Sequence, residues 1–303
     1  QAWGTVVESG PAVTARASVA TPPRSPARPI DEIEIALVAT RTCGVSELDR
    51  VLGGGLVPGA VILMAGEPGV GKSTLLLDVA GRMARDGTRV LYITGEESAA
   101  QVRLRAQRIG AVHPELMLAA ESDLATVLGH VEAVDPGLLI LDSVQTIASA
   151  SVEGGAGGVA QVREVAAGVI ATAKSRHLPV VLVGHVTKDG GIAGPRVLEH
   201  LVDVVCQFEG DRNSRLRMVR AVKNRYGPTD EVGCFDLSDT GIVGLADPSG
   251  LFLSERATGE PGTCVTITLD GARPMPIEIQ ALVAPSATPH PRRATSGVDS
   301  ARI

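Results

Sequence analysis

The chain has 303 residues, enough for one large domain or two modest ones with a buried core. Its 44% hydrophobic and 20% charged residues are typical of a globular protein, and no apolar run is long enough to predict a membrane helix. The net charge of −6 argues against a basic nucleic-acid coat protein, and 2% aromatic residues argue against base stacking. Any nucleic-acid contact would therefore go mainly through phosphates, at local clusters of lysine and arginine.

The cysteines are too scattered for a zinc site: Cys43, Cys206, Cys234 and Cys264 lack paired spacing. Their small or apolar neighbours predict buried free thiols, with disulfides as the less favoured alternative. No signal peptide opens the sequence. We therefore expect a reducing, cytoplasmic location.

In chain order, residues 1–29 are rich in proline, alanine, serine and arginine, and we expect a flexible lead-in. From Ile30 to Asp247 strand-like runs alternate with amphipathic helical runs, which predicts an α/β domain with a mainly parallel sheet. The expected strands are Ala60–Ala65, Arg89–Thr94, Leu116–Ala119, Leu138–Leu141 and Val180–Val183, and the helices include Lys72–Arg85 and Ala99–Ile109.

After Val202 the pattern changes to strands joined by polar turns, which predicts an antiparallel extension of the sheet. Its expected strands are Asp203–Glu209, Leu216–Val222 and Val232–Leu237. From Pro274 onward we expect structure only in Ile277–Val283.

A phosphate-binding loop lies between a predicted strand and a predicted helix. The segment matches the G-x-x-x-x-G-K-[ST] pattern of ATP-binding proteins, with Gly66, Glu67, Pro68, Gly69, Val70, Gly71, Lys72, Ser73 and Thr74. Its glycines let backbone N–H groups face phosphate oxygens, Lys72 is expected to reach the β- and γ-phosphates, and Ser73 is expected to bind Mg²⁺. The alternative is a glycine-rich turn without a ligand.

An acid ends the next apolar strand. Leu138–Leu141 precede Asp142, so its carboxylate is expected at the carboxyl edge of a parallel sheet, where it would hold Mg²⁺. A helix N-cap or turn aspartate is the alternative.

Two further acids, Glu96 and Glu97, follow the strand that ends at Thr94. We expect one to face the γ-phosphate and the other to cap the helix starting at Ser98. Glu96 is the first choice as general base, with Glu97 second. Both could instead be ordinary first-turn acids.

Several motifs together resemble the RadA/Sms family of bacterial DNA-repair ATPases, which have the RecA fold and are allied to DnaB-type helicases. The resemblance covers residues 30–283. The matching segments are Arg41–Gly55, Gly66–Thr74, Gly95–Ser98, Leu141–Thr146, Val183–Gly190 and Val222–Gly227. The last one, Val-Lys-Asn-Arg-Tyr-Gly, resembles the family signature KNRFG, with Tyr226 in the place of phenylalanine.

The resemblance implies roles for Lys223 and Arg225. In the family these residues couple nucleotide state to DNA binding at a subunit boundary, so here they are expected to reach a neighbour's γ-phosphate. A solvated basic turn is the alternative. His185 takes the place of the γ-phosphate sensor of RecA-fold proteins, with a core histidine as the alternative.

Two loops match the DNA-binding loops of the RecA fold. The two loops are Glu153–Gly158 and Lys188–Arg196. The expected DNA contacts are Lys188 and Arg196 of the second loop, together with Lys223. Plain surface loops are the alternative.

The family also carries an N-terminal four-cysteine zinc finger and a C-terminal Lon-protease-like domain. We expect residues 1–29 to follow a removed finger, 30–273 to form the ATPase domain, and 274–303 to begin the Lon-like domain. Zinc is expected only in the missing finger.

The resemblance implies a DNA-dependent ATPase of recombinational repair that translocates on single strands and promotes branch migration. Expected partners are single-stranded and branched DNA, a RecA-type recombinase, and further copies in a ring of hexamer type; no membrane partner is expected. Alternatives are a DnaB-type replicative helicase, a KaiC-like regulatory ATPase acting on protein, and a nucleotide-dependent interaction module without turnover.

Overall fold

The computed structural model describes residues 27–32, 39–185, 195–210, 214–238, 240–249, 261–285, 293–299 and 301. The chain divides into two units, residues 1–37 and residues 38–303. In the first, the structure describes a 3₁₀ helix, η1 (Ile30–Glu32). The flexible lead-in expected at 1–29 lies almost wholly outside the described residues.

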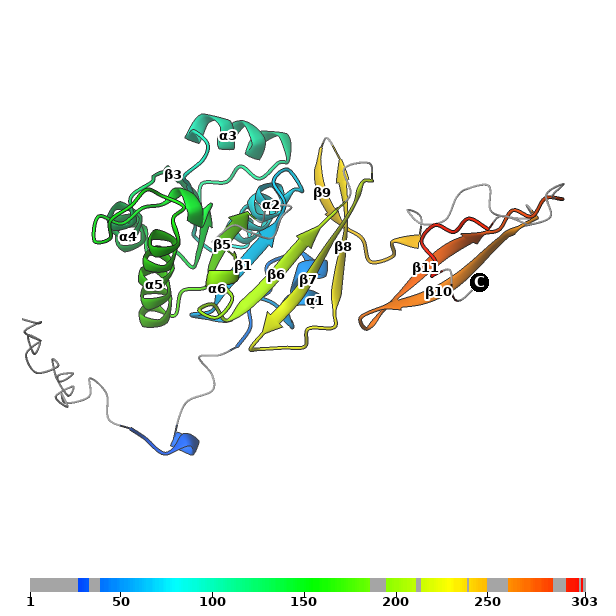
Figure 1. Cartoon of the computed structure of the whole chain (residues 1–303). Coiled ribbons are helices and arrows are strands. Elements are labelled where there is room, and N and C mark those ends of the chain that lie inside the picture. Colours follow the sequence, from blue (N-terminus) through cyan, green and yellow to red (C-terminus); the bar gives the residue numbers. More distant parts are fainter. Residues whose placement is uncertain are drawn as a thin grey trace, which may run out of the picture. The chain divides into compact units, whose positions relative to one another are not determined.

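The second unit is built on one nine-stranded sheet with the order β3-β2-β4-β5-β1-β6-β7-β8-β9 (Figure 1). Six strands are parallel: β1 (Val61–Gly66), β2 (Val90–Thr94), β3 (Leu116–Ala120), β4 (Leu138–Asp142), β5 (Val180–His185) and β6 (Val204–Glu209). Three antiparallel strands extend it: β7 (Leu216–Asn224), β8 (Val232–Ser238) and β9 (Gly241–Gly244). The predicted α/β fold with a mainly parallel sheet and an antiparallel extension is confirmed.

Helices cover both faces of the sheet. The first face packs against α1 (Ser46–Leu52), α2 (Lys72–Arg85) and α3 (Ala99–Arg108); the second packs against α4 (Leu124–Val134), α5 (Val159–Arg176) and α6 (Pro195–Leu198). Strand alternation divides the core: Ile62 and Met64 of β1 join the first cluster, and Val61, Leu63 and Ala65 join the second. Both faces of β1 are buried, as expected for a central parallel strand.

A two-stranded sheet follows, formed by β10 (Thr263–Asp270) and β11 (Arg273–Gln280). The structure expected at Ile277–Val283 is confirmed as far as Gln280, but β11 begins earlier, at Arg273. Strand β10, which precedes Pro274, had not been predicted; its alternating Val265, Ile267 and Leu269 are exposed, Ile267 by 70%. The expected domain boundary between residues 273 and 274 falls inside this hairpin.

A buried ion pair joins the hairpin to the large sheet. Arg273, 6% exposed, hydrogen-bonds through Nη1 to Oε2 of Glu47, which is 1% exposed and belongs to α1. Arg273 Nη1 also donates to the carbonyl of Val232, and Cys234 N–H donates to Glu47 Oε2. These contacts link α1, β8 and β11 within one network.

The thiols Cys43, Cys206 and Cys234 are buried and free, as expected. Cys264 corrects that expectation, because it is exposed on β10. Burial raises the pKa of Cys206 to about 12, so this thiol stays protonated. Within the described residues, no helix combines the length and apolar character needed to cross a membrane.

Candidate nucleotide site

The carboxyl ends of four parallel strands bring the predicted site residues together. Gly66 of β1 pairs with His185 of β5, and Thr94 of β2 pairs with Asp142 of β4. The N–H of Gly95 also donates to the carbonyl of Asp142 over 2.8 Å. In a parallel sheet all these ends meet at one edge, which is where such folds bind ligands.

The phosphate loop has the backbone that its sequence requires. Gly69 and Gly71 have φ angles of 79° and 114°, a left-handed region that favours glycine. Helix α2 begins at Lys72, so its N-terminus faces the loop, and the partly buried Ser73 and Thr74 lie in its first turn. This geometry fits a bound phosphate group.

Lys72 is 3% exposed, and its Nζ donates to the carbonyls of Gly66 and Glu67, each over 2.8 Å. Burial lowers the pKa of Lys72 to about 8, against the opposing effect of the charges on Asp142 and Glu96. The ammonium is thus held next to the loop in a poorly solvated place, where a phosphate would be a strong partner.

Asp142, 7% exposed, receives a hydrogen bond from the hydroxyl of Tyr92 to Oδ2 over 2.6 Å. Tyr92 on β2 is fully buried, and burial, followed by the charge of Asp142, raises its pKa well above the usual value. The tyrosine therefore stays a donor and orients the carboxylate. Ser73 and Asp142 carry oxygen atoms of the kind that could hold Mg²⁺.

The structure separates the two adjacent acids. Glu96 Oε1 accepts a hydrogen bond from Ser143 Oγ over 2.5 Å and lies 2.8 Å from His185 Nε2. Both contacts use the same carboxylate oxygen, so they orient Glu96 toward the edge where His185 meets Gly66. A carboxylate held in this way can accept a proton from a water molecule.

Glu97 lies elsewhere, in a 2.5 Å ion pair with Arg105 of α3. The expectation that one of these acids would cap the helix is wrong. Ser98 itself is the N-cap and forms a reciprocal capping box with Gln101. The contacts of the two acids favour Glu96 over Glu97 as the base.

Three supporting residues had not been predicted. Tyr92 and Ser143 hold Asp142 and Glu96, and Arg217 of β7 donates through Nε to the carbonyl of Val70 in the phosphate loop over 3.0 Å. Ser143 lies in the matching segment Leu141–Thr146, but no role in the site had been predicted for it. The Arg217 contact spans 147 residues, so nothing local in the sequence pointed to it.

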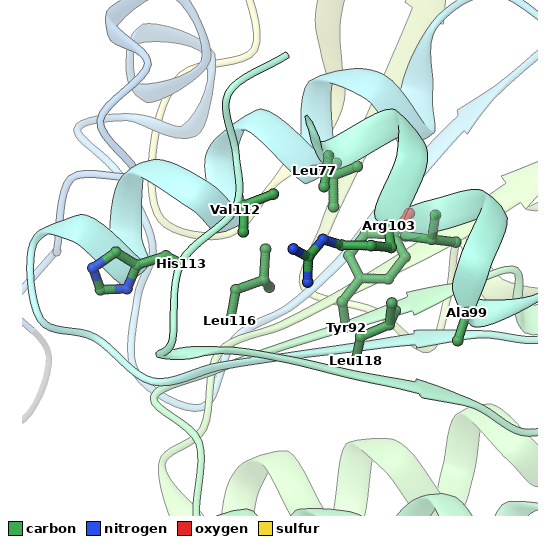
Figure 2. A pocket seen from close by; sticks show the side chains of 10 residues that line it. Leu77, Tyr92, Ala99, Arg103, Val112, His113, Leu116 and Leu118 are labelled. Carbon is green, nitrogen blue, oxygen red and sulfur yellow. The ribbon is translucent and has the colours of Figure 1, made fainter. Parts of the chain in front are cut away.

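An apolar cavity of about 230 Å³ lies between α2, α3, β2 and β3, and Tyr92 forms part of its wall (Figure 2). Its lining includes Leu77, Val102, Leu116 and Leu118. Tyr92 thus has its ring in an apolar wall and its hydroxyl in the site.

Lys223 and Arg225 lie at the opposite edge of the sheet. Asp203, next to them, pairs with the start of β1 at Val61, whereas the phosphate loop follows its end. The two ends of β1, Val61 and Gly66, are five residue steps apart along the strand, which corresponds to roughly 17 Å. This separation does not suit a contact of Arg225 with a nucleotide in its own loop.

Each of these cations already has protein partners. Lys223 Nζ donates to the carbonyls of Glu199 and Val202 over 2.7 Å, and Arg225 Nη1 donates to Asp203 Oδ1 over 3.0 Å. Burial and then the charge of Arg225 lower the pKa of Lys223. Lys223 is therefore tied to the turn that directly follows α6.

The first expected DNA loop is anchored by Gln161, which is 2% exposed. Its Nε2 donates to the carbonyls of Ser149, Val152 and Gly154. Of the second loop, Lys188 lies outside the described residues, and so does the side chain of Arg196.

The chain was compared with known proteins and structures. Residues 27–191 match a family model described as an AAA domain. The chain is 58% identical over 311 residues to the DNA repair protein RadA of Mycolicibacterium smegmatis, covering 99% of this chain and 66% of that protein. RadA of Mycobacterium tuberculosis is also 58% identical, with 99% and 63% covered. RadA of Streptococcus pyogenes is 45% identical, with 100% and 67% covered.

Among solved structures, a KaiC-like protein from Pyrococcus horikoshii aligns with a TM-score of 0.57 at 19% identity, covering 69% of this chain and 99% of that one. This likeness shows the fold alone. The chain spans about two thirds of the length of the curated relatives. On the identity to those relatives and the match of its core, the chain belongs to the RadA family of DNA repair proteins, and its core is an AAA-type, RecA-like domain.

Proposed function

We propose that this chain is an ATP-hydrolysing motor of recombinational DNA repair. In this proposal, copies assemble in a ring of hexamer type around single-stranded DNA, and hydrolysis drives translocation and branch migration of recombination intermediates. Branched DNA and a RecA-type recombinase are the proposed partners. The RadA relatives, which are named DNA repair proteins, support the repair context.

The phosphate edge of the sheet supplies the groups for hydrolysis. The loop and Lys72 would hold the phosphates of ATP, and Ser73 with Asp142 would hold Mg²⁺, which supplies charge neutralisation when bound. Glu96 would accept the proton of the attacking water, with His185 beside it to respond to the γ-phosphate.

The observation that carries the proposal is the distance between this edge and Arg225. Because Arg225 lies at the far end of β1, it could complete only the site of another copy. A site completed by a neighbour makes hydrolysis depend on assembly, as a ring motor requires.

The contacts of Lys223 support a link between DNA and nucleotide. Lys223 holds the turn after α6, and α6 begins within the second expected DNA loop. Lys223 also lies two residues from Arg225, so we expect DNA bound next to α6 to influence the arginine through this lysine.

The proposal is tested by ATP turnover with and without single-stranded DNA, on the parent chain and on Lys72→Ala and Lys223→Ala. We expect DNA to accelerate the parent, Lys72→Ala to abolish turnover, and Lys223→Ala to lose the acceleration. Arg108→Ala on α3 is the matched control cation and should keep it. A parent rate that DNA does not change would overturn the DNA-dependent motor.

A mixing experiment tests the subunit boundary. Lys72→Ala and Arg225→Ala chains should each be inactive, but an assembled mixture should regain part of the parental rate. An Arg225→Ala copy keeps an intact phosphate loop, and a Lys72→Ala copy keeps an intact Arg225. Where the two are neighbours in the mixture, one complete site can form. A mixture as inactive as its parts would contradict the neighbour's arginine.

A further inference from the structure

A buried carboxylate, Asp203, holds the side chain of Arg225. Asp203 is 3% exposed and immediately precedes β6. Its Oδ1 accepts from Arg225 Nη1 over 3.0 Å, and its Oδ2 accepts from the N–H of Val61 over 3.0 Å and from Lys174 Nζ over 2.6 Å. One carboxylate thus joins the signature segment, the first residue of β1 and helix α5.

The charge of Asp203 is compensated twice. A buried ionised carboxylate is stable only when it is paired and hydrogen-bonded. Burial by itself would raise the pKa of Asp203, but the Lys174 and Val61 hydrogen bonds and the charges of Lys174 and Arg225 lower it below its usual value. Without Arg225, Lys174 would still compensate the charge and, with the Val61 N–H, still bind Oδ2, whereas Oδ1 would lose its bond to Arg225.

Arg225 can move its side chain without moving its backbone. Its N–H donates to the carbonyl of Asp203 over 3.2 Å, which continues the β6–β7 pairing. The side chain, in contrast, is 55% exposed, and its salt bridge within the described residues is the one to Asp203. A rotation into solvent would break that bond, and Lys174 would remain as the cation that compensates the buried carboxylate.

Lys174 is suited to be the second cation. It lies near the end of α5, is 46% exposed, and makes the shorter of the two ion pairs with Asp203. Despite partial burial, the bond to Asp203 and a further contribution from Tyr226 raise the pKa of Lys174, so it stays charged.

We propose that Asp203 is a positioning residue that holds the Arg225 guanidinium at its own subunit's sheet edge, and that Lys174 takes over the carboxylate when Arg225 turns to a neighbouring copy. The proposal rests on the role of Arg225 proposed above. Lys174 thereby lowers the free-energy cost of releasing the arginine. Neither residue would touch the nucleotide.

The test measures kcat and KM for ATP of the assembled chain with single-stranded DNA. Lys174→Met leaves Asp203 dependent on Arg225, so we expect kcat to fall roughly fivefold with KM unchanged. Lys174→Arg keeps a cation and should keep most of the rate. Asp203→Asn no longer holds the arginine and should turn over at or above the parental rate.

The decisive chain is the double variant Asp203→Asn/Lys174→Met. With the carboxylate removed, loss of Lys174 should no longer matter, and kcat should return to that of Asp203→Asn. A general loss of stability at Lys174 would not be rescued in this way, and thermal unfolding of each variant checks the fold.

The outcomes separate this inference from the proposed function. If Arg225→Ala keeps the parental rate, the neighbour's arginine itself fails. If Arg225→Ala is inactive, the proposed motor stands, and three results would each overturn the positioning role. These are full activity of Lys174→Met, a double variant that is not rescued, and an Asp203→Asn variant slower than the parent.

Discussion

The hydroxyl of Tyr92 donates a hydrogen bond to Oδ2 of Asp142 over 2.6 Å, and both side chains are buried. The bond crosses from β2 to β4, and it fixes the rotation of the carboxylate that ends β4. Tyr92 lines the apolar cavity (Figure 2), so the bond connects the wall of that cavity with the proposed magnesium ligand Asp142.

We predict that Tyr92→Phe raises the Mg²⁺ concentration needed for half-maximal ATP turnover, because Asp142 loses its orienting donor. The free energy of unfolding should also fall by about 1.5–3 kcal/mol, the range for a hydrogen bond to a charged group. Titration of turnover with Mg²⁺ and urea unfolding measure the two effects. The other tyrosine supplies the control: Tyr226→Phe should leave the Mg²⁺ requirement unchanged. An equal requirement in Tyr92→Phe and the parent would argue against the orienting role.

The second prediction concerns the adjacent acids. Glu96→Gln should lower kcat by roughly 10²- to 10⁴-fold, the usual contribution of a general base, with nucleotide affinity retained. Glu97→Gln is the matched control, because Glu97 pairs with Arg105 and should affect turnover far less. Single-turnover hydrolysis and binding of a fluorescent nucleotide distinguish them. A larger loss in Glu97→Gln than in Glu96→Gln would reverse the assignment.

The third prediction follows from the pKa of Lys72, about 8 in the folded protein against 10.5 for an ordinary lysine. Phosphate binding requires the charged form, so ATP affinity should decline above pH 8 and approach a tenfold loss per pH unit. Nucleotide titrations between pH 7 and pH 9.5 measure this. A flat affinity over that range would show that the lysine remains charged.

In the absence of nucleotide, the lowered pKa of Lys72 has the opposite effect: the free energy of unfolding rises with pH. Between pH 8 and pH 10.5 the unfolded chain binds more protons at Lys72 than the folded chain does. The destabilisation is therefore fully present below pH 8 and is relieved as the pH rises through this window. The parent should gain stability relative to Lys72→Met from pH 7.5 to pH 9.5, as measured by urea unfolding.

The fourth prediction concerns the buried pair of Glu47 and Arg273. Arg273→Met removes the hydrogen-bonded, buried cation of the 1% exposed Glu47 and leaves, among the described residues, only the half-exposed Arg50, 3.7 Å from Oε1, so the free energy of unfolding should fall by about 3 kcal/mol. Glu47→Met/Arg273→Met removes both charges and should be more stable than the Arg273 variant alone. Denaturant unfolding of the parent, the two single variants and the double variant measures the coupling. Strict additivity would contradict a direct interaction.

Much of the phosphate site could be predicted from the sequence, because its parts are contiguous. The loop from Gly66 to Ser73 needs only glycines with positive φ, a lysine and a helix start, all within eight residues. The strands that end at Asp142 and His185, and the strand that precedes Glu96, show the same kind of signal: short apolar runs that each end in a polar residue.

The pairing of these residues could not be predicted in the same way. Glu96 and Glu97 are neighbours with the same chemistry, and only the strand order β2-β4-β5 decides that Glu96 meets Ser143 and His185. Capping by Ser98 was missed although Ser98 and Gln101 have the spacing of a capping box, whereas the pairing of Glu97 with Arg105 appears only in the structure.

The sequence by itself thus determined the type of fold, the phosphate loop and the segment that contains Lys223 and Arg225, since each depends on interactions between near neighbours. The tertiary structure alone decided which partners those residues have. The hydrogen bonds of Asp203 to Val61 and of Arg273 to Glu47 span 142 and 226 residues. Such contacts exist only after the sheet has formed, because sheet order and register bring the two partners together.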